Sequence, residues 1–141
     1  MPGDRELRIR YVNMPLIYEY SVHNDQDAKN LKSQRADLSA AIDLAKRRLQ
    51  GADEVQRKSA QQELDRLHAE GERLRTREEF HKQRLLGEIN RAMASVASRL
   101  SVDYIFSTGD ALVYFRKEHD VTESVLRELA AIRKRNAPVA R

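Results

Sequence analysis

The side chains that most often carry out chemistry are scattered through this chain. Its four histidines are far apart in the sequence: His23, His68, His81 and His119. No two of them stand at the spacing of a metal-binding or nucleophile motif, and the absence of cysteine excludes a disulfide framework and a thiolate metal site. Gly51 and Gly109 stand in turn-like sequences, not in a phosphate-binding loop. We therefore predict structural or surface roles for the histidines, no metal, no cofactor and no enzymatic activity.

The clearest charged cluster groups five basic residues around a predicted turn at residues 51–53. These residues are Lys46, Arg47, Arg48, Arg57 and Lys58. Asp53 and Glu54 oppose them, so the cluster has a net charge of five minus two, or +3. Two interpretations are open: the basic side chains complement helix ends and keep the turn in water, or they bind a partner.

Two long charged segments meet at this turn. In the first, apolar residues recur at alternating spacings of four and three, which predicts one narrow stripe along a helix. The second segment continues this heptad pattern, and the stripe is weakened at Arg35, Gly71, Glu78 and His81. A stripe this narrow can pair two antiparallel helices but cannot surround a globular core. The sequence therefore predicts a coiled-coil hairpin that projects into solvent.

The ends of the two helices have recognisable signals. We expect the first helix to run from Pro15 to Gln50 and to end with Gly51 in the left-handed conformation. Asp53 is predicted to cap the second helix, with Gln56 completing a capping-box-like pattern.

Residues typical of strands gather near the two ends of the chain. The segment 8–13 alternates basic and apolar side chains, which predicts a half-buried strand that ends at Asn13. The segments 103–107 and 111–115 are predicted to form a β-hairpin with its turn at residues 108–110. Both faces of this β-hairpin are apolar, so it needs covering on both sides.

A last helix is predicted to begin at Asp120 or Thr122 and to end before Pro138. It can cover one face of the apolar region near the chain ends, and we expect it to leave several apolar side chains uncovered. Association between copies of the chain would bury them. The residues predicted to form this contact are Ile9, Tyr11, Ile89, Val96, Leu100, Ile105 and Val113.

Composition limits the classes of protein to which the chain can belong. Its 141 residues suit one domain, and charged residues make up 34% of them, with a mean hydropathy of −0.73. The net charge of +4 and the pI near 9.5 favour an acidic or mixed-charge partner, although acids and bases alternate along both long segments. No apolar run is long enough to cross a membrane, and the first ten residues lack the apolar core of a secretory signal.

Several short motifs occur in an order that resembles the Skp (OmpH-like) chaperone family. They are RYVNM at 10–14, SVAS at 95–98, VDYIF at 102–106 and DVTESVL at 120–126, with the charged hairpin between the first two. The resemblance covers about Arg8 to Leu129. It implies an α+β, mostly helical chain in which a long antiparallel coiled-coil hairpin projects from a small β-containing trimerisation body.

The resemblance also implies a function. Members of this family are homotrimers whose helical arms enclose a cavity, in which unfolded outer-membrane proteins are held without ATP and kept from aggregating in the periplasm. The five basic residues of the turn then become candidate client-binding residues. An anionic membrane surface is a further candidate partner, and specific nucleic-acid binding is not expected. The residues alone leave open a nonchaperone coiled-coil scaffold or a basic nucleic-acid-binding protein.

We divide the chain accordingly into a body and an arm. The predicted body is discontinuous and comprises residues 8–25 and 86–135. The arm comprises residues 26–85, with its tip at 51–53. Residues 1–7 and 136–141 are predicted to be flexible tails.

Overall fold

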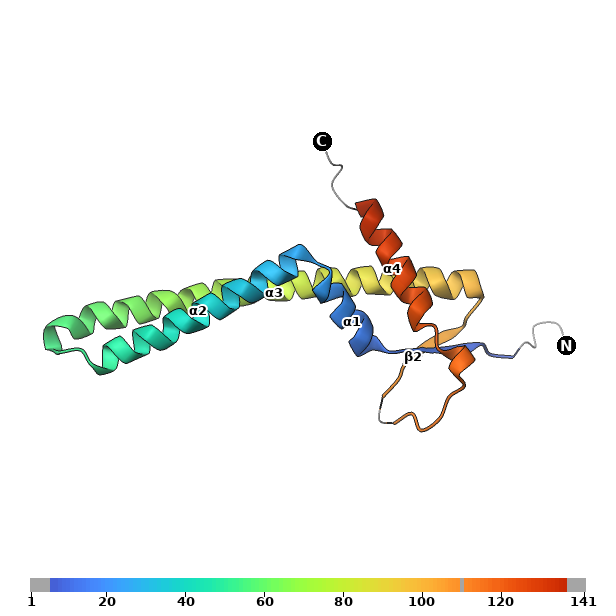
Figure 1. Cartoon of the computed structure of the whole chain (residues 1–141), viewed down its shortest axis with the longest axis horizontal. Helices are drawn as coiled ribbons and strands as arrows, with labels where there is room; N and C mark the ends of the chain where they lie inside the picture. Colours follow the sequence, from blue (N-terminus) through green and yellow to red (C-terminus); the bar gives the residue numbers. More distant parts are fainter. Residues whose placement is uncertain (1–5, 110, 137–141) are drawn as a thin grey trace. The chain divides into compact units, whose positions relative to one another are not determined.

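A computed structural model of the chain describes residues 6–109 and 111–136 (Figure 1). The elements follow in the order β1 (Ile9–Val12), α1 (Met14–His23), α2 (Gln26–Gln50), α3 (Glu54–Leu100), β2 (Tyr104–Ser107), the short 3-10 helix η1 (Lys117–His119) and α4 (Thr122–Asn136). The prediction of a mostly helical chain with a small β component is confirmed. Most of each predicted tail lies outside the described residues.

The chain divides into two compact units. His23–Gln83 forms one, here called the hairpin unit, and the segments up to Val22 and from Arg84 form the other, the body unit. The predicted arm was 26–85. α3 contributes to both units, because it continues without a break through the boundary.

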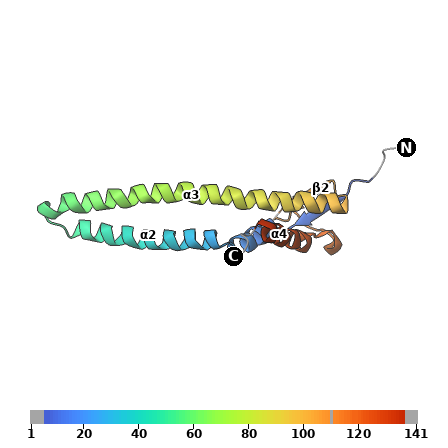
Figure 2. The ribbon, with the colours of Figure 1, turned by 90° about the horizontal axis from the view of Figure 1, so that it is seen from above.

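The hairpin unit consists of α2 and the first part of α3, which run antiparallel and side by side in both views (Figures 1 and 2). The predicted stripe forms its core, in which the buried side chains are Leu38, Ala45, Leu64, Leu67 and Leu74. The outer faces of both helices are charged. Even at 47 residues, α3 lacks the apolar length needed to cross a membrane, and the same holds for every other helix in the described ranges.

In the connection between α2 and α3, one predicted helix end is as expected and the other is not. Asp53 accepts a hydrogen bond from the backbone N–H of Gln56 at 2.9 Å, as expected of an N-cap. The expectation of a left-handed Gly51 is wrong, because its φ of −91° and ψ of 0° are right-handed. The Gly51 N–H donates to the carbonyl of Arg47 at 3.2 Å, so the last turn of α2 closes without a left-handed residue.

The first predicted helix is in fact two helices. α1 ends at His23, and α2 begins after Asp25, whose backbone is extended. The Asp25 carboxylate accepts a hydrogen bond from the N–H of Ala28 at 2.9 Å. A carboxylate in this position satisfies a free backbone donor of a new helix, and this is why the chain restarts here instead of continuing from Pro15.

The predicted β-hairpin is wrong. β2 pairs in parallel with β1, in the register Ile9 with Tyr104 and Val12 with Ser107. The segment 111–115 is irregular, and of the predicted turn at 108–110 residue 110 lies outside the described residues. Val113 and Tyr114 are 94% and 79% exposed. A two-stranded hairpin without a packed face is marginal in water, whereas β1 rests on the core of the body unit and offers β2 a supported edge.

The body unit has a continuous apolar core. Its buried side chains come from β1, α1, the last part of α3, α4 and the residue before α4: Val12, Ile17, Ile89, Ala92, Val96, Val121, Val125, Leu129 and Ile132. The predicted start of α4 is confirmed: Asp120 accepts hydrogen bonds from the backbone N–H and the hydroxyl of Thr122 at 2.9 and 2.5 Å. Asn13 ends β1 as expected, and its N–H donates to the Thr122 hydroxyl at 2.9 Å.

Polar contacts also join α4 to α3 within the body unit. The Ser95 hydroxyl donates to Glu128 at 3.1 Å, and Arg99 pairs with the same carboxylate at 3.5 Å. Glu88 of α3 is buried; Arg133 of α4 lies 3.7 Å from it, and Arg84, one turn earlier on α3, lies 2.8 Å from it. These contacts fix the orientation of α4 across the apolar core.

Candidate functional site

The five predicted client-binding residues are all exposed at the closed end of the hairpin unit. Lys46, Arg47 and Arg48 lie at the end of α2, while Arg57 and Lys58 lie near the start of α3. Arg47 donates from Nε to the carbonyl of Asp43 at 3.4 Å. The turn therefore brings the basic residues of both helices to one end of the unit.

These residues do not share one surface. Arg48 lines a groove of about 710 Å³ with Ala52, Val55 and Glu63. Arg57 and Lys58 line a second groove of about 610 Å³, whose other walls come from residues 49–50 and 61–62. The tip is thus a pair of grooves, each combining basic and apolar or amide side chains.

Acidic side chains offset the positive charge of the tip more than the net charge of +3 counted from the sequence indicated. Glu63 lies in the Arg48 groove, and Arg66 donates to it at 2.7 and 3.0 Å. The hydrogen bond from Arg66 lowers the pKa of Glu63 below its ordinary value, and the charge of Arg48 acts in the same direction. Arg66 also pairs with Glu70 at 2.8 Å. The carboxylate therefore stays ionised beside the basic groove.

The residues predicted to join copies of the chain are divided between the core and the surface of the body unit. Ile89 and Val96 are fully buried within the single chain, contrary to the expectation that the last helix would leave them uncovered. Ile105 and Leu100 are half-buried against the same core, and Tyr11 on β1 is half-buried as well. α4 covers this region because four of its residues, at spacings of three and four, face the core: Thr122, Val125, Leu129 and Ile132.

An exposed aromatic surface lies on the strands of the body unit and extends beyond the predicted residues. Tyr104 and Phe106 are about half exposed and stack at 6.1 Å between ring centroids. Tyr11 lies 6.4 Å from Phe106 and 5.3 Å from Phe115. β2 pairs with β1 on one edge, and no other strand of the described chain pairs with its second edge. Tyr104 and Phe106 were missed as contact residues because a β-hairpin would have buried them.

Two of the charged residues that interrupt the hairpin stripe pair with each other. Arg35 of α2 donates two hydrogen bonds to Glu78 of α3, at 2.5 and 3.2 Å. The hydrogen bond to Glu78 raises the pKa of Arg35 further above its ordinary value. The sequence identified both positions as defects in the stripe but not as partners, because they are 43 positions apart.

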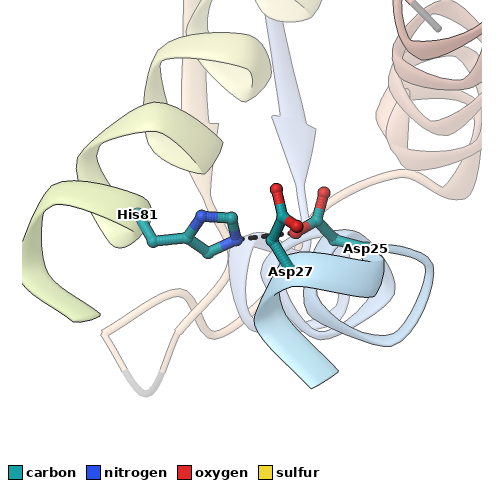
Figure 3. A group of neighbouring side chains, drawn as sticks. All are labelled: Asp25, Asp27 and His81. Carbon is teal, nitrogen blue, oxygen red and sulfur yellow. Dashed lines mark hydrogen bonds and ion pairs between the residues drawn. The ribbon is translucent and has the colours of Figure 1, made fainter. Parts of the chain in front are cut away.

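A third feature of the hairpin unit is a group of two carboxylates and one imidazole (Figure 3). Nε2 of His81 lies 2.6 Å from Oδ2 of Asp25, and both residues are buried. Asp27, in the first turn of α2, is exposed, and one ligand atom from each of the three residues lies within 4.8 Å of the others. Asp25 and Asp27 flank the start of a helix that sequence reasoning had not placed there, so the group could not be found from the sequence.

Comparison with known proteins gives matches among protein families and among solved structures. The family of outer membrane proteins described as OmpH-like matches residues 8–129. A crystal structure of a candidate outer membrane chaperone (OmpH-like) from Caulobacter crescentus is 14% identical, with a TM-score of 0.42, and the match covers 92% of this chain and 88% of that one. Curated proteins give no significant match.

Proposed function

The chain belongs to the OmpH-like family of outer membrane proteins, and from this premise we propose that it is an ATP-independent holdase chaperone. Its clients would be unfolded outer-membrane proteins, held between the arms of a homotrimer in the periplasm. The observation that carries the proposal is the family match over residues 8–129, which includes the hairpin and both parts of the body. The proposal further requires surfaces for clients and for other copies of the chain.

The hairpin unit offers exposed apolar side chains next to charged ones. Val55 is 89% exposed in the groove that contains Arg48, and Phe80 is 75% exposed on α3. Isolated contacts of this kind bind weakly, but many of them acting together hold a long flexible client, and each can be released separately. This combination suits a protein that must prevent aggregation and still release its client.

The body unit offers the surface for association. Tyr104 and Phe106 on β2, and Val113 and Tyr114 in the irregular segment after it, are exposed large apolar residues, and β2 keeps an edge that no described strand pairs. An exposed strand edge with apolar side chains is a template for pairing with another chain. We infer that copies of the chain meet here and that three of them form the oligomer.

Light scattering on the purified protein tests the association. We expect the mass of a trimer for the natural sequence and a smaller mass for Val113→Asp. Val113 is 94% exposed in the single chain, so the substitution should leave the fold and its circular dichroism unchanged. A monomer mass for the natural sequence would contradict the proposal.

Client protection is tested by diluting an unfolded β-barrel membrane protein into buffer without nucleotide and following its aggregation. We expect the protein to suppress aggregation. Replacing the five basic tip residues by Glu should weaken client binding by about tenfold at low salt and reduce its salt dependence, because electrostatic attraction would be lost.

The matched control reverses the same number of charges elsewhere in the hairpin unit. Five exposed basic residues away from the tip serve for this purpose: Lys29, Lys32, Arg73, Arg75 and Lys82. Equal losses in both variants would show that net charge, and not the tip, governs capture. Tight binding of duplex DNA without client protection would favour the basic nucleic-acid-binding alternative, and neither activity would favour a scaffold.

A further inference from the structure

Two carboxylates and one imidazole converge at the start of α2 in the hairpin unit. Asp25 is the N-cap of α2, Asp27 follows two residues later, and His81 reaches them from α3 (Figure 3). The Asp25 carboxylate accepts hydrogen bonds from the N–H of Ala28 and from His81. The Asp27 side chain forms no hydrogen bond or ion pair with any described residue. One imidazole thus faces two neighbouring carboxylates.

The three side chains of this group together carry a negative charge. With a neutral imidazole the two carboxylates give a net charge of −2, and an imidazolium would still leave −1. The positive end of α2 explains part of this preference for acids. Arg77 lines the same groove as Asp27 and His81 but forms no ion pair with any described residue. A divalent cation between the three side chains would neutralise both carboxylates.

The donor set indicates which cation. Imidazole nitrogen together with carboxylate oxygen is a ligand set of Zn²⁺ and related transition-metal ions, whereas Mg²⁺ and Ca²⁺ prefer oxygen alone. Around one Zn²⁺, with bonds of about 2.0–2.2 Å, donor atoms lie about 3.4 Å apart. The three atoms here lie within 4.8 Å of one another. Rotation of the exposed Asp27 side chain brings its carboxylate closer, while Nε2 of His81 and Oδ2 of Asp25, which lie 2.6 Å apart, must separate to admit the ion.

We propose that Asp25, Asp27 and His81 form a binding site for one divalent transition-metal ion. The ion replaces the hydrogen between His81 and Asp25: Nε2 becomes the ligand atom, and the ring proton resides on Nδ1. A groove of about 500 Å³ lined by Asp27 and His81 gives the ion access from solvent. The bound ion would tie the first turn of α2 to α3 through three side chains, in place of the single hydrogen bond between His81 and Asp25. This site departs from the prediction that the histidines bind no metal.

Isothermal titration of the chelator-treated, full-length protein with ZnCl₂ tests the site. We expect saturation at one ion per chain and an accompanying rise in the melting temperature, because the ion binds the folded state. Co²⁺ should give the visible absorption spectrum of a site with nitrogen and oxygen ligands. A parallel titration with MgCl₂ should show much weaker binding, and equal affinity would overturn the assignment to a transition metal.

Asp27→Asn is the decisive variant. Asp27 is exposed and its side chain forms no hydrogen bond or ion pair with a described residue, so the substitution should leave the fold intact. We expect Zn²⁺ affinity to fall by more than about tenfold, since even residues that only orient a ligand change affinity by that much. His81→Gln should lose binding as well, and Asp25→Asn should weaken it while retaining the helix cap, because Asn caps as well as Asp.

Matched controls are His68→Gln on α3 and Asp37→Asn on α2, both at exposed positions of the same unit. They should bind Zn²⁺ like the natural sequence. Loss of binding in His68→Gln, full binding in Asp27→Asn, or no saturable binding by the natural sequence would each overturn the proposal.

Discussion

Single residues in the hairpin unit matter through their partners across the stripe. A heptad position normally requires an apolar side chain, yet Arg35 and Glu78 occupy two of them. Because the two meet, each provides the polar partner that the other needs. The stripe therefore tolerates one charged layer as long as both members are present.

A double-mutant cycle checks this interpretation. Arg35→Met and Glu78→Met should each lower the melting temperature of the hairpin unit by leaving a charge without its partner. The double variant should recover most of the loss, because two apolar side chains complete the stripe. Thermal unfolding followed by circular dichroism measures the effect, and losses that simply add would contradict pairing.

The pairing of Glu63 with Arg66 makes the stability of the fold depend on pH, in a direction that follows from the charge of Arg66. Arg66 holds the pKa of Glu63 below the ordinary value of 4.5 in the folded chain. The resulting stabilisation is fully present above pH 4.5 and is lost as the pH falls through the lowered pKa. Natural sequence and Glu63→Gln should therefore differ in urea unfolding at neutral pH and converge in acid. A difference in stability between the two proteins that grows as the pH falls would contradict this prediction.

At the scale of elements, α4 holds the body unit together. Leu129 is fully buried between α4 and the rest of the core, so Leu129→Ala should destabilise the body unit by about 2–5 kcal/mol. Arg127→Ala, on the exposed side of the same helix, should change stability by less than about 0.5 kcal/mol. Chemical denaturation of the two variants makes the comparison, and similar midpoints would contradict a core role for α4.

The helices were largely predictable from the sequence, because their signals are local. Heptad spacing identified α2 and the hairpin part of α3, and Asp53 and Asp120 marked helix starts. The restart at Asp25 was hidden, since the surrounding residues favour helix on both sides and only the carboxylate bond to Ala28 reveals the cap.

Strand pairing and the site contacts were not predictable in the same way, because they join distant residues. β1 and β2 are both short, and their pairing depends on the core beneath them. Nothing local distinguishes β2 from the equally strand-like segment 111–115. His81 and Asp25 are 56 positions apart, and the two charged members of the stripe, Arg35 and Glu78, looked like separate defects.

At the scale of the whole molecule, the two units differ in how they are held together. Each layer of the hairpin unit buries one or two side chains, whereas nine buried residues share one core in the body unit. We expect backbone amides of 31–49 and 57–74 to exchange hydrogen faster than those of 89–97. Mass-spectrometric hydrogen exchange measures this, and equal protection along α3 would contradict it.

The parallel pairing of β1 with β2 has a consequence for the order of folding. The partners Ile9 and Tyr104 are separated by most of the chain, and closing so large a loop is entropically unfavourable and slow. The hairpin unit has only nearest-neighbour contacts along its stripe and can zip from its turn without waiting for the body. Once it has formed, the contact between Asp25 and His81 brings its two ends together and removes about sixty residues from the effective loop. β1, the first strand to be synthesised, would thus be among the last to find its partner, and substitutions that slow the zipping of the hairpin should slow formation of the sheet.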